Sequence, residues 1–340
     1  MPSPSVLKLS LAMAAMCLVV GPACRPKPRV PGWVQAAPGG SLAALSGEAG
    51  WMLNRKEVQS LISREPMVER ALDLFLQKAH INPATETGRV TFHILDMPSQ
   101  APQSLQKGLE HALVQLNQFN DPAALLAAMA EAFPQEGTLH LQGKDWPLYV
   151  ILDVEAKGTK AHIRAASDEK GQIWLGSLEG LQRMASEPSL AATPEAALAA
   201  EWINAKAPFQ GYLNAESLLS GLRQNLDQSI IKDMPQGVHD LFWSITPGKE
   251  EGSAKEQPIQ FDLALSGTPE GINQVTPWLQ RLVAAANAIQ GGPGAAPELM
   301  QEKRRVGLRA SLTPEQLKLI MEKLGQPAFS LSRLPRGPKA

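Results

Sequence analysis

The chain lacks an excess of charge of either sign. Its 340 residues include 32 basic and 33 acidic side chains, so the formal net charge is −1. This balance leaves no electrostatic footprint for nucleic acid, and we expect no nucleic-acid partner. Walker A and G-x-G-x-x-G strings are also missing, which removes the commonest phosphate-binding loops. The glycine-rich stretch Gly291–Gly294 contains Pro293 and follows no strand pattern, so we assign it as a loop without a ligand.

A long hydrophobic run is missing as well. The run Leu9–Val20 has about a dozen residues, whereas a membrane-spanning helix needs about 20. It is preceded by a single basic residue, Lys8, and followed by Gly21-Pro22-Ala23. A basic start, a short apolar segment and a small-residue cleavage site are the marks of an export signal. We therefore expect residues 1–23 to be a signal peptide.

Cysteine is scarce, because the chain holds only Cys17 and Cys24. Removal of the signal would leave Cys24 as the single thiol, so no disulfide could form within the remaining chain. An unpaired cysteine in an exported protein needs a reason, and acylation supplies one. On Ala23 and Cys24 the chain resembles exported bacterial lipoproteins, although Gly21 and Pro22 stand where a lipobox usually carries leucine and then alanine or serine. The resemblance implies lipidation of Cys24; plain secretion and an uncleaved anchor are the alternatives.

The residues after Cys24 predict a spacer. Arg25–Gly32 contains three prolines and three positive charges, a composition that stays extended and semi-stiff. We expect residues 24–38 to form a Pro-rich tether, whose charges could also lie against anionic lipid.

The clearest secondary-structure pattern lies in the C-terminal part. Ile259–Leu265 alternates in polarity, which indicates a half-buried strand. Thr268 is then expected to cap a helix that begins with Pro269 and runs to about Ala288. The same pattern repeats at Val306–Leu312, followed by a capping box at 313–316. The other elements expected here are strands at 209–215 and 238–246 and helices at 216–229 and 313–324.

The N-terminal part predicts a similar mixture of elements. We expect strands at 41–46, 90–94, 139–141, 148–154, 161–165 and 173–176, helices at 51–63, 66–79, 122–133 and 178–185, and an ambiguous segment at 112–119.

The order of elements across 208–325 is β-α-β-β-α-β with one trailing helix, which is the ferredoxin-like order. We therefore predict an α+β fold of two ferredoxin-like modules, a pair that could have arisen by duplication, with antiparallel sheets covered by helices. The modules would span 39–186 and 208–326. A linking helix would lie within 187–207, and residues 327–340 would form a disordered tail.

The histidines offer a candidate metal site. His93, His140 and His162 each fall on the polar phase of an expected strand, so neighbouring strands could place them on one solvated face. An ordinary wet sheet face explains the same pattern, because no carboxylate or cysteine is fixed beside them. We therefore assign no metal ligand and no cofactor.

A serine nucleophile is the other candidate. Ser104-Leu105-Gln106-Lys107 fits the S-x-x-K pattern of penicillin-recognising enzymes, but the companion S-D-N and K-T-G strings are missing. A solvated helix or loop face explains so short a string better, and we assign no catalytic residue.

Tryptophan is abundant for a chain with only two tyrosines. We expect most of the seven tryptophans in the core, Trp174 and Trp243 among them, and we expect Trp33 and Trp51 to be partly exposed.

These observations predict an exported, lipid-anchored, non-catalytic protein of the cell envelope, in the periplasm or at the outer surface. In organisation it resembles uncharacterised exported bacterial proteins built from repeated α+β units. It would contact the membrane through a lipid on Cys24 and present its modules to a protein or other envelope partner. The alternative is an envelope hydrolase or a small-ligand-binding protein with a site assembled from residues distant in sequence.

Overall fold

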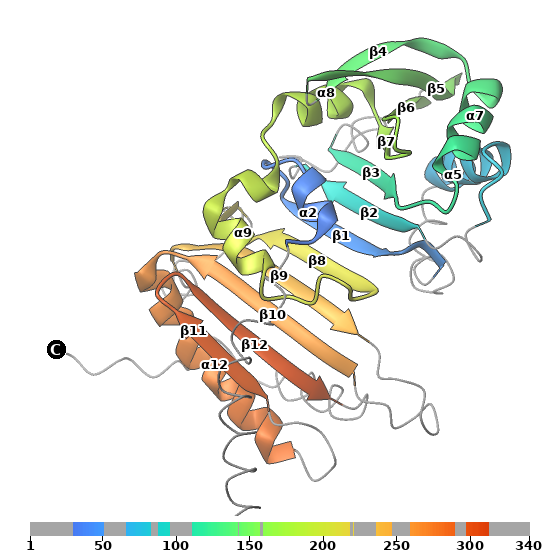
Figure 1. Ribbon diagram of the computed structural model, residues 1–340. Coiled ribbons are helices and arrows are strands. Elements are labelled where there is room, and N and C mark those ends of the chain that lie inside the picture. The colour runs from blue at the N-terminus through green and yellow to red at the C-terminus, as the bar shows by residue number, and fades with distance from the viewer. Residues whose placement is uncertain are drawn as a thin grey trace, which may run out of the picture.

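One antiparallel sheet of twelve strands forms the centre of the part of the chain that the computed structural model describes (Figure 1). The described residues are 30–50, 66–82, 88–95, 111–141, 143–156, 159–217, 220, 236–246, 259–289 and 297–312. The strand order is β11-β12-β10-β9-β8-β1-β2-β3-β7-β6-β5-β4. The strands are β1 Ala43–Glu48, β2 Arg89–Ile94, β3 Ala112–Asn117, β4 Gln135–Leu141, β5 Lys144–Ala156, β6 Thr159–Ser167, β7 Ile173–Gly176, β8 Phe209–Asn214, β9 Val238–Thr246, β10 Ile259–Gly267, β11 Glu298–Glu302 and β12 Arg305–Leu312.

The prediction of two ferredoxin-like modules is wrong. The first strands of the two halves, β1 and β8, pair antiparallel with Ala43 opposite Leu213, so both halves belong to one sheet. A split βαβ unit needs two parallel strands with a third between them. Here β1 and β2, which flank a helical segment in the chain, are direct antiparallel neighbours. The order of elements along the chain does not determine which strands pair, and the pairing is what the prediction lacked.

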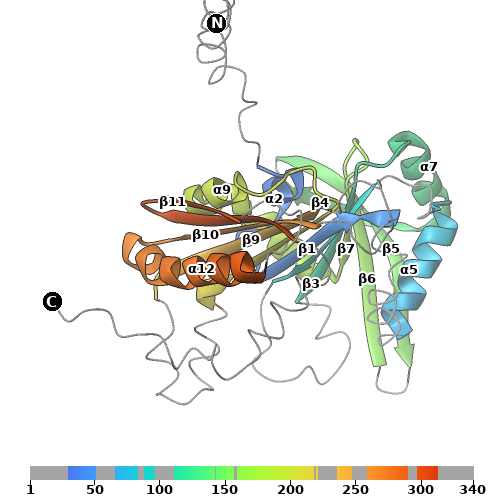
Figure 2. The ribbon, with the colours of Figure 1, turned by 90° about the horizontal axis from the view of Figure 1, so that it is seen from below.

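Helices cover both faces of the sheet (Figure 2). The described helices are α2 Gly32–Ala36, α5 Pro66–Lys78, α7 Pro122–Ala132, α8 Leu178–Ser186, the 3₁₀ turn η1 Leu190–Ala192, α9 Pro194–Ala200 and α12 Pro269–Ile289. Side chains of α2, η1, α8 and α9 pack on one face, which we call the α9 face. Those of α5, α7 and α12 pack on the opposite face, which we call the α12 face.

Two helix starts follow the predicted capping chemistry. The side chain of Asp121 accepts a hydrogen bond of 3.0 Å from the amide of Ala124 at the start of α7. Thr268 Oγ1 accepts one of 3.1 Å from the amide of Gly271 at the start of α12. In both cases a proline occupies the first helical position, where no amide hydrogen is needed. The predicted ends of these helices lie within a residue of the observed ones.

The described residues begin at Val30, inside the range expected for the tether. Helix α2 starts at Gly32, and the adjacent Val30 already packs against the apolar cluster of the α9 face. Trp33 is only 1% exposed, so the expectation that it would be partly exposed is wrong. Its indole packs in the apolar cluster between the short helix and the sheet, a contact with no local sequence signature.

The other tryptophans divide between core and surface. Trp146 and Trp174 are buried, as expected for most of the group, whereas Trp202, Trp243 and Trp278 are half-buried. Trp243 lies over Gly211, its partner on β8. A Cβ at Gly211 would stand 2.0 Å from the indole, which explains why glycine occupies this strand position. Trp51 lies outside the described residues.

Candidate functional site

A row of polar side chains crosses the strands on the α9 face, and we call it the polar row. Its neighbouring members stand opposite one another in the strand register, in the order Gln115, Thr91, Ser46, Gln210, Ser244, Asp262 and Arg309. All except Arg309 are buried. Buried polar groups are costly unless they are hydrogen-bonded, so the partners of the row indicate its role.

In the middle of the row, Gln210 holds an irregular segment against the sheet. Its Nε2 donates to the carbonyl oxygens of Asn204, Ala205 and Ala207 at 3.2, 3.0 and 3.0 Å. Its Oε1 accepts a hydrogen bond of 2.5 Å from Nε1 of Trp33. Residues 204–207 belong to no strand, and the amide of Gln210 gives their carbonyl oxygens a donor beside the bonds from the Ala207 amide to Asn204 and from Arg89 to Ala207.

The C-terminal end of the row continues this network. The amide of Asn204 donates to Ser244 Oγ at 3.1 Å, and Ser244 Oγ donates to Asp262 Oδ2 at 2.9 Å. Arg309 Nε donates to Asp262 Oδ1 at 2.6 Å, which neutralises the buried carboxylate. This part of the row is fully occupied in holding the chain together, and we assign it a structural role.

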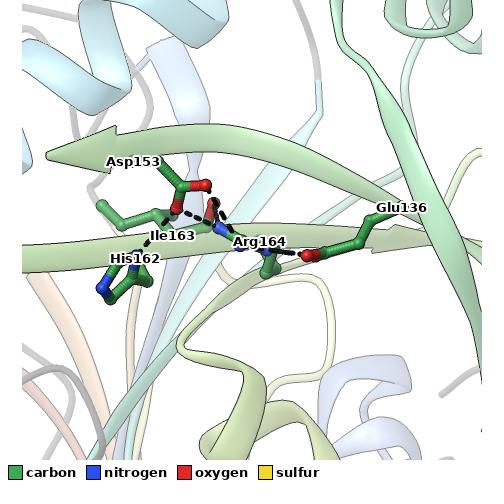
Figure 3. Close-up of polar contacts among 5 residues, drawn as sticks. All are labelled: Glu136, Asp153, His162, Ile163 and Arg164. Atoms are coloured by element: carbon green, nitrogen blue, oxygen red, sulfur yellow. Dashed lines mark hydrogen bonds and ion pairs between the residues drawn. The ribbon is translucent and has the colours of Figure 1, made fainter.

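A second polar group lies on β4, β5 and β6 (Figure 3). Arg164 donates from Nη1 and Nη2 to the two carboxylate oxygens of Asp153, at 2.6 and 3.2 Å. On its other side Nε donates to Glu136 Oε2 at 2.5 Å. Nδ1 of His162 lies 2.9 Å from Asp153 Oδ1. We call these four residues the Arg164 cluster.

The electrostatics of the Arg164 cluster favour the charged forms of Arg164 and Asp153. The side chain of Arg164 is only 9% exposed, whereas those of Asp153 and Glu136 are about half exposed. Burial alone would lower the pKa of Arg164, but the bonds to Asp153 and Glu136 raise it overall. The bonds from Arg164, and then from His162, lower the pKa of Asp153. Charge-assisted, forked pairs of this kind are the strongest polar contacts in proteins.

The Arg164 cluster contains part of a catalytic arrangement. A carboxylate that orients a histidine is one component of many acid–base sites. Acyl transfer needs a nucleophile and oxyanion donors in addition, and the cluster itself consists of two carboxylates, an imidazole and a guanidinium. Because the guanidinium is shared between both carboxylates, its charge is already matched. The geometry fits a clamp across three strands better than a reactive centre.

The structure does not bring the three candidate histidines together. His93 is buried on β2 against the ring of Trp174, with the ring centroids 5.1 Å apart. His162 lies on the same face but on β6, with β3 and β7 between them. His140 lies on the opposite face and pairs with Asp145 at 2.9 Å. Among the described residues no group of three or more histidine, cysteine or acidic side chains could hold a metal ion.

Other sequence candidates lie outside the described residues. They are Cys17, Cys24, Ser104, Lys107 and the glycine-rich stretch at 291–294. The structure therefore tests neither the lipidation of Cys24 nor the S-x-x-K string.

A pocket of about 200 Å³ opens between the first residues of β5, the end of β6 with the turn after it, and α7. Trp146, Tyr149 and Leu126 form its apolar lining. Lys144 and Glu169 stand at the pocket, paired at 2.5 Å and both largely exposed. It contains none of the histidine, serine, lysine or cysteine candidates from the sequence, and its volume is below the roughly 300–1,000 Å³ of a typical ligand pocket.

The sequence contained one overlooked signal. Asp153 stands at an odd position of an apolar strand, and His162 and Arg164 alternate on the next strand. Polar residues at every second position share a face, so this pattern could have predicted the cluster. Glu136 could not have been included, because it reaches the face through a register shift between Gln135 and Gly137.

None of the helices in the described ranges has the length and apolarity to cross a membrane. Comparisons with protein-family models, curated proteins and solved structures found no match to this chain.

Proposed function

We propose that the protein is exported, anchored through a lipid on Cys24, and acts as a non-catalytic binding platform in the cell envelope. The observation that carries the proposal is the short distance along the chain between Cys24 and the fold. Val30, six residues after Cys24, already contacts the apolar cluster of the α9 face. Six residues span at most about 20 Å. A lipid on Cys24 would therefore hold the sheet close to the membrane surface, because the connecting segment is short.

The shape of the sheet suits a binding platform. Helices buttress both faces, so the sheet is stiff and its outer strands are held in place. Among the described strands, β4 and β11 each pair on one side only. An outer strand of this kind offers backbone donors and acceptors to an extended segment of another protein. The partner of the platform would therefore be a protein segment that adds to one edge.

The anchor is tested with the two cysteines of the chain, expressed with the full signal. Cys24→Ser should move the protein from the detergent phase to the aqueous phase in a phase-partition assay. Cys17→Ser is the matched control, because Cys17 lies in the apolar run, and it should leave the protein in the detergent phase. Mass spectrometry of the mature N-terminal peptide should show the added acyl mass on Cys24. Unchanged partition of Cys24→Ser would contradict the anchor.

The partner is tested with a photo-crosslinking residue at three exposed positions. Thr138 on β4 and Gln301 on β11 lie on the outer strands, whereas Glu270 lies on α12. Crosslinks to one envelope protein are expected from an outer strand and not from position 270. Turnover of an envelope substrate by the purified protein would contradict the non-catalytic part of the proposal.

A further inference from the structure

Five neighbouring polar side chains on β2 and β3 form a patch on the α9 face. Arg89, Thr91 and His93 alternate along β2, while Gln115 and Asn117 alternate along β3. The strand register places Arg89 opposite Asn117 and Thr91 opposite Gln115. We call these five residues the β2–β3 patch. It includes Thr91 and Gln115 of the polar row, and Arg89 also donates to the carbonyl of Ala207.

The β2–β3 patch differs from the rest of the row because three of its residues, His93, Gln115 and Asn117, have buried polar atoms without a hydrogen bond, whereas Thr91 and Arg89 are bonded to Ser46. Gln115 is 0% exposed, and neither atom of its amide has a partner. His93 is 1% exposed, and neither ring nitrogen lies in hydrogen-bonding geometry with a partner, although the side chain of Gln115 is near enough to oppose the lowering of the pKa of His93 by burial. Asn117 Oδ1 is likewise buried without a partner. The large majority of buried side-chain polar atoms in proteins are hydrogen-bonded, so five unpartnered atoms on two adjacent strands call for an explanation.

The patch also holds an unmatched positive charge. Arg89 is 8% exposed and donates to two neutral oxygens, Ser46 Oγ at 3.1 Å and the carbonyl of Ala207 at 2.6 Å. Among the described residues it forms no ion pair, and the exposed carboxylate of Glu48 acts on it only at longer range. A guanidinium has five N–H donors, so Arg89 retains donors for a further acceptor.

We propose that the β2–β3 patch binds a small hydroxycarboxylate. The carboxylate matches the charge of Arg89 and accepts from the donors of Arg89 and Gln115. The hydroxyl donates its one hydrogen to one of the two unpartnered acceptors, Gln115 Oε1 or Asn117 Oδ1. The ring of Trp174, which stands against His93 and opposite Gln115, is the apolar neighbour of these polar groups. This site is independent of the anchor and of the sheet edges.

Three small probes separate the two chemical requirements of the site. Lactate carries both a carboxylate and a hydroxyl, acetate carries only the carboxylate, and 1,2-propanediol carries only hydroxyls. At equal ionic strength, lactate should raise the melting temperature of the purified full chain most, acetate less, and propanediol least. Ligand that binds only the folded state stabilises it in proportion to the logarithm of its concentration. No rise above that of sodium chloride with either anion would overturn the proposal.

A matched pair of substitutions tests the residues. Gln115 and Gln210 are both 0% exposed and lie in the same polar row, but only Gln210 is hydrogen-bonded. Gln115→Met should raise the melting temperature of the unliganded protein by about 2 °C, because it removes a buried, unpartnered amide. It should also weaken lactate binding at least tenfold. Gln210→Met should lower the melting temperature.

The other outcomes count against the site. A fall in the melting temperature of Gln115→Met, or a failure of that variant to fold, would show that the amide is satisfied in solution by water alone. An equal response of the parent and Gln115→Met to lactate would place binding elsewhere. In Arg89→Gln, acetate should raise the melting temperature no more than propanediol does. If acetate still raised it more, the role of Arg89 would be overturned.

Discussion

Nε1 of Trp33 donates a hydrogen bond of 2.5 Å to Oε1 of Gln210, which lies 177 residues further along the chain. The bond joins the first described helix to β8 and to the segment that Gln210 holds in place. The beginning of the fold and its middle are therefore parts of one core.

Trp33→Phe should lower the free energy of unfolding by about 2 kcal/mol, because it removes a buried donor and part of a buried ring. Urea unfolding followed by circular dichroism measures the loss. Gln35→Ala, a change on the exposed side of the same helix, should cost no more than about 0.5 kcal/mol. Similar losses for the two variants would show that α2 does not belong to the core.

His93 should make the unliganded protein sensitive to mild acid. Burial lowers the pKa of His93 from 6.5 to about 4, so the unfolded chain binds the proton first. The contribution of His93 to stability is complete above pH 6.5 and is lost as the pH falls toward 4. A shift of this size corresponds to about 3 kcal/mol. His93→Phe should remove this slope from the free energy of unfolding between pH 7.5 and 4. A variant with the parental slope would contradict the assignment.

Arg164→Gln should cost about 1.5 kcal/mol, since it leaves two adjacent carboxylates without their shared cation. The expected loss of free energy of unfolding is small because solvent screens both carboxylates, which are about half exposed. The pKa of Asp153 should rise, which carboxyl chemical shifts in an NMR titration would detect. Arg304→Gln is the matched control: its pair with Glu195 is also short, at 2.7 Å, but Arg304 is 59% exposed. Equal costs for the two arginines would contradict the clamp across β4–β6.

Gly211→Ala should destabilise the sheet by roughly 2 kcal/mol or more, because the new methyl group meets the indole of Trp243. Trp243→Leu should recover most of that loss in the double variant, and a thermodynamic cycle measures the coupling. Gly137→Ala on β4, where nothing lies within 4 Å of the added carbon, is the control. Additive effects of Gly211→Ala and Trp243→Leu would show that the two side chains do not compete for space.

Local patterns identified most elements but not their partners. Alternation and capping predicted β10, α12 and β9 nearly to the residue, because those signals lie within a few positions of the chain. Strand β11, Glu298–Glu302, was missed because its sequence has no clear alternation. The pairing of β1 with β8 was also missed, since it depends on residues some 170 positions apart. The same limit applies to the β2–β3 patch: His93 was noticed as a polar-phase histidine, but its burial beside Gln115 depends on which strands and helices surround it.

The pairing of β1 with β8 also delays part of folding, because β1 is synthesised long before β8. At roughly 5 to 20 residues per second, β1 leaves the ribosome on the order of 10 to 30 seconds before the strand that completes it. During that interval one hydrogen-bonding edge of β1 is open, and its apolar side chains have no α9 helix above them. Residues 43–48 consequently wait with an unpaired strand edge, and slowed synthesis before residue 214 should promote aggregation.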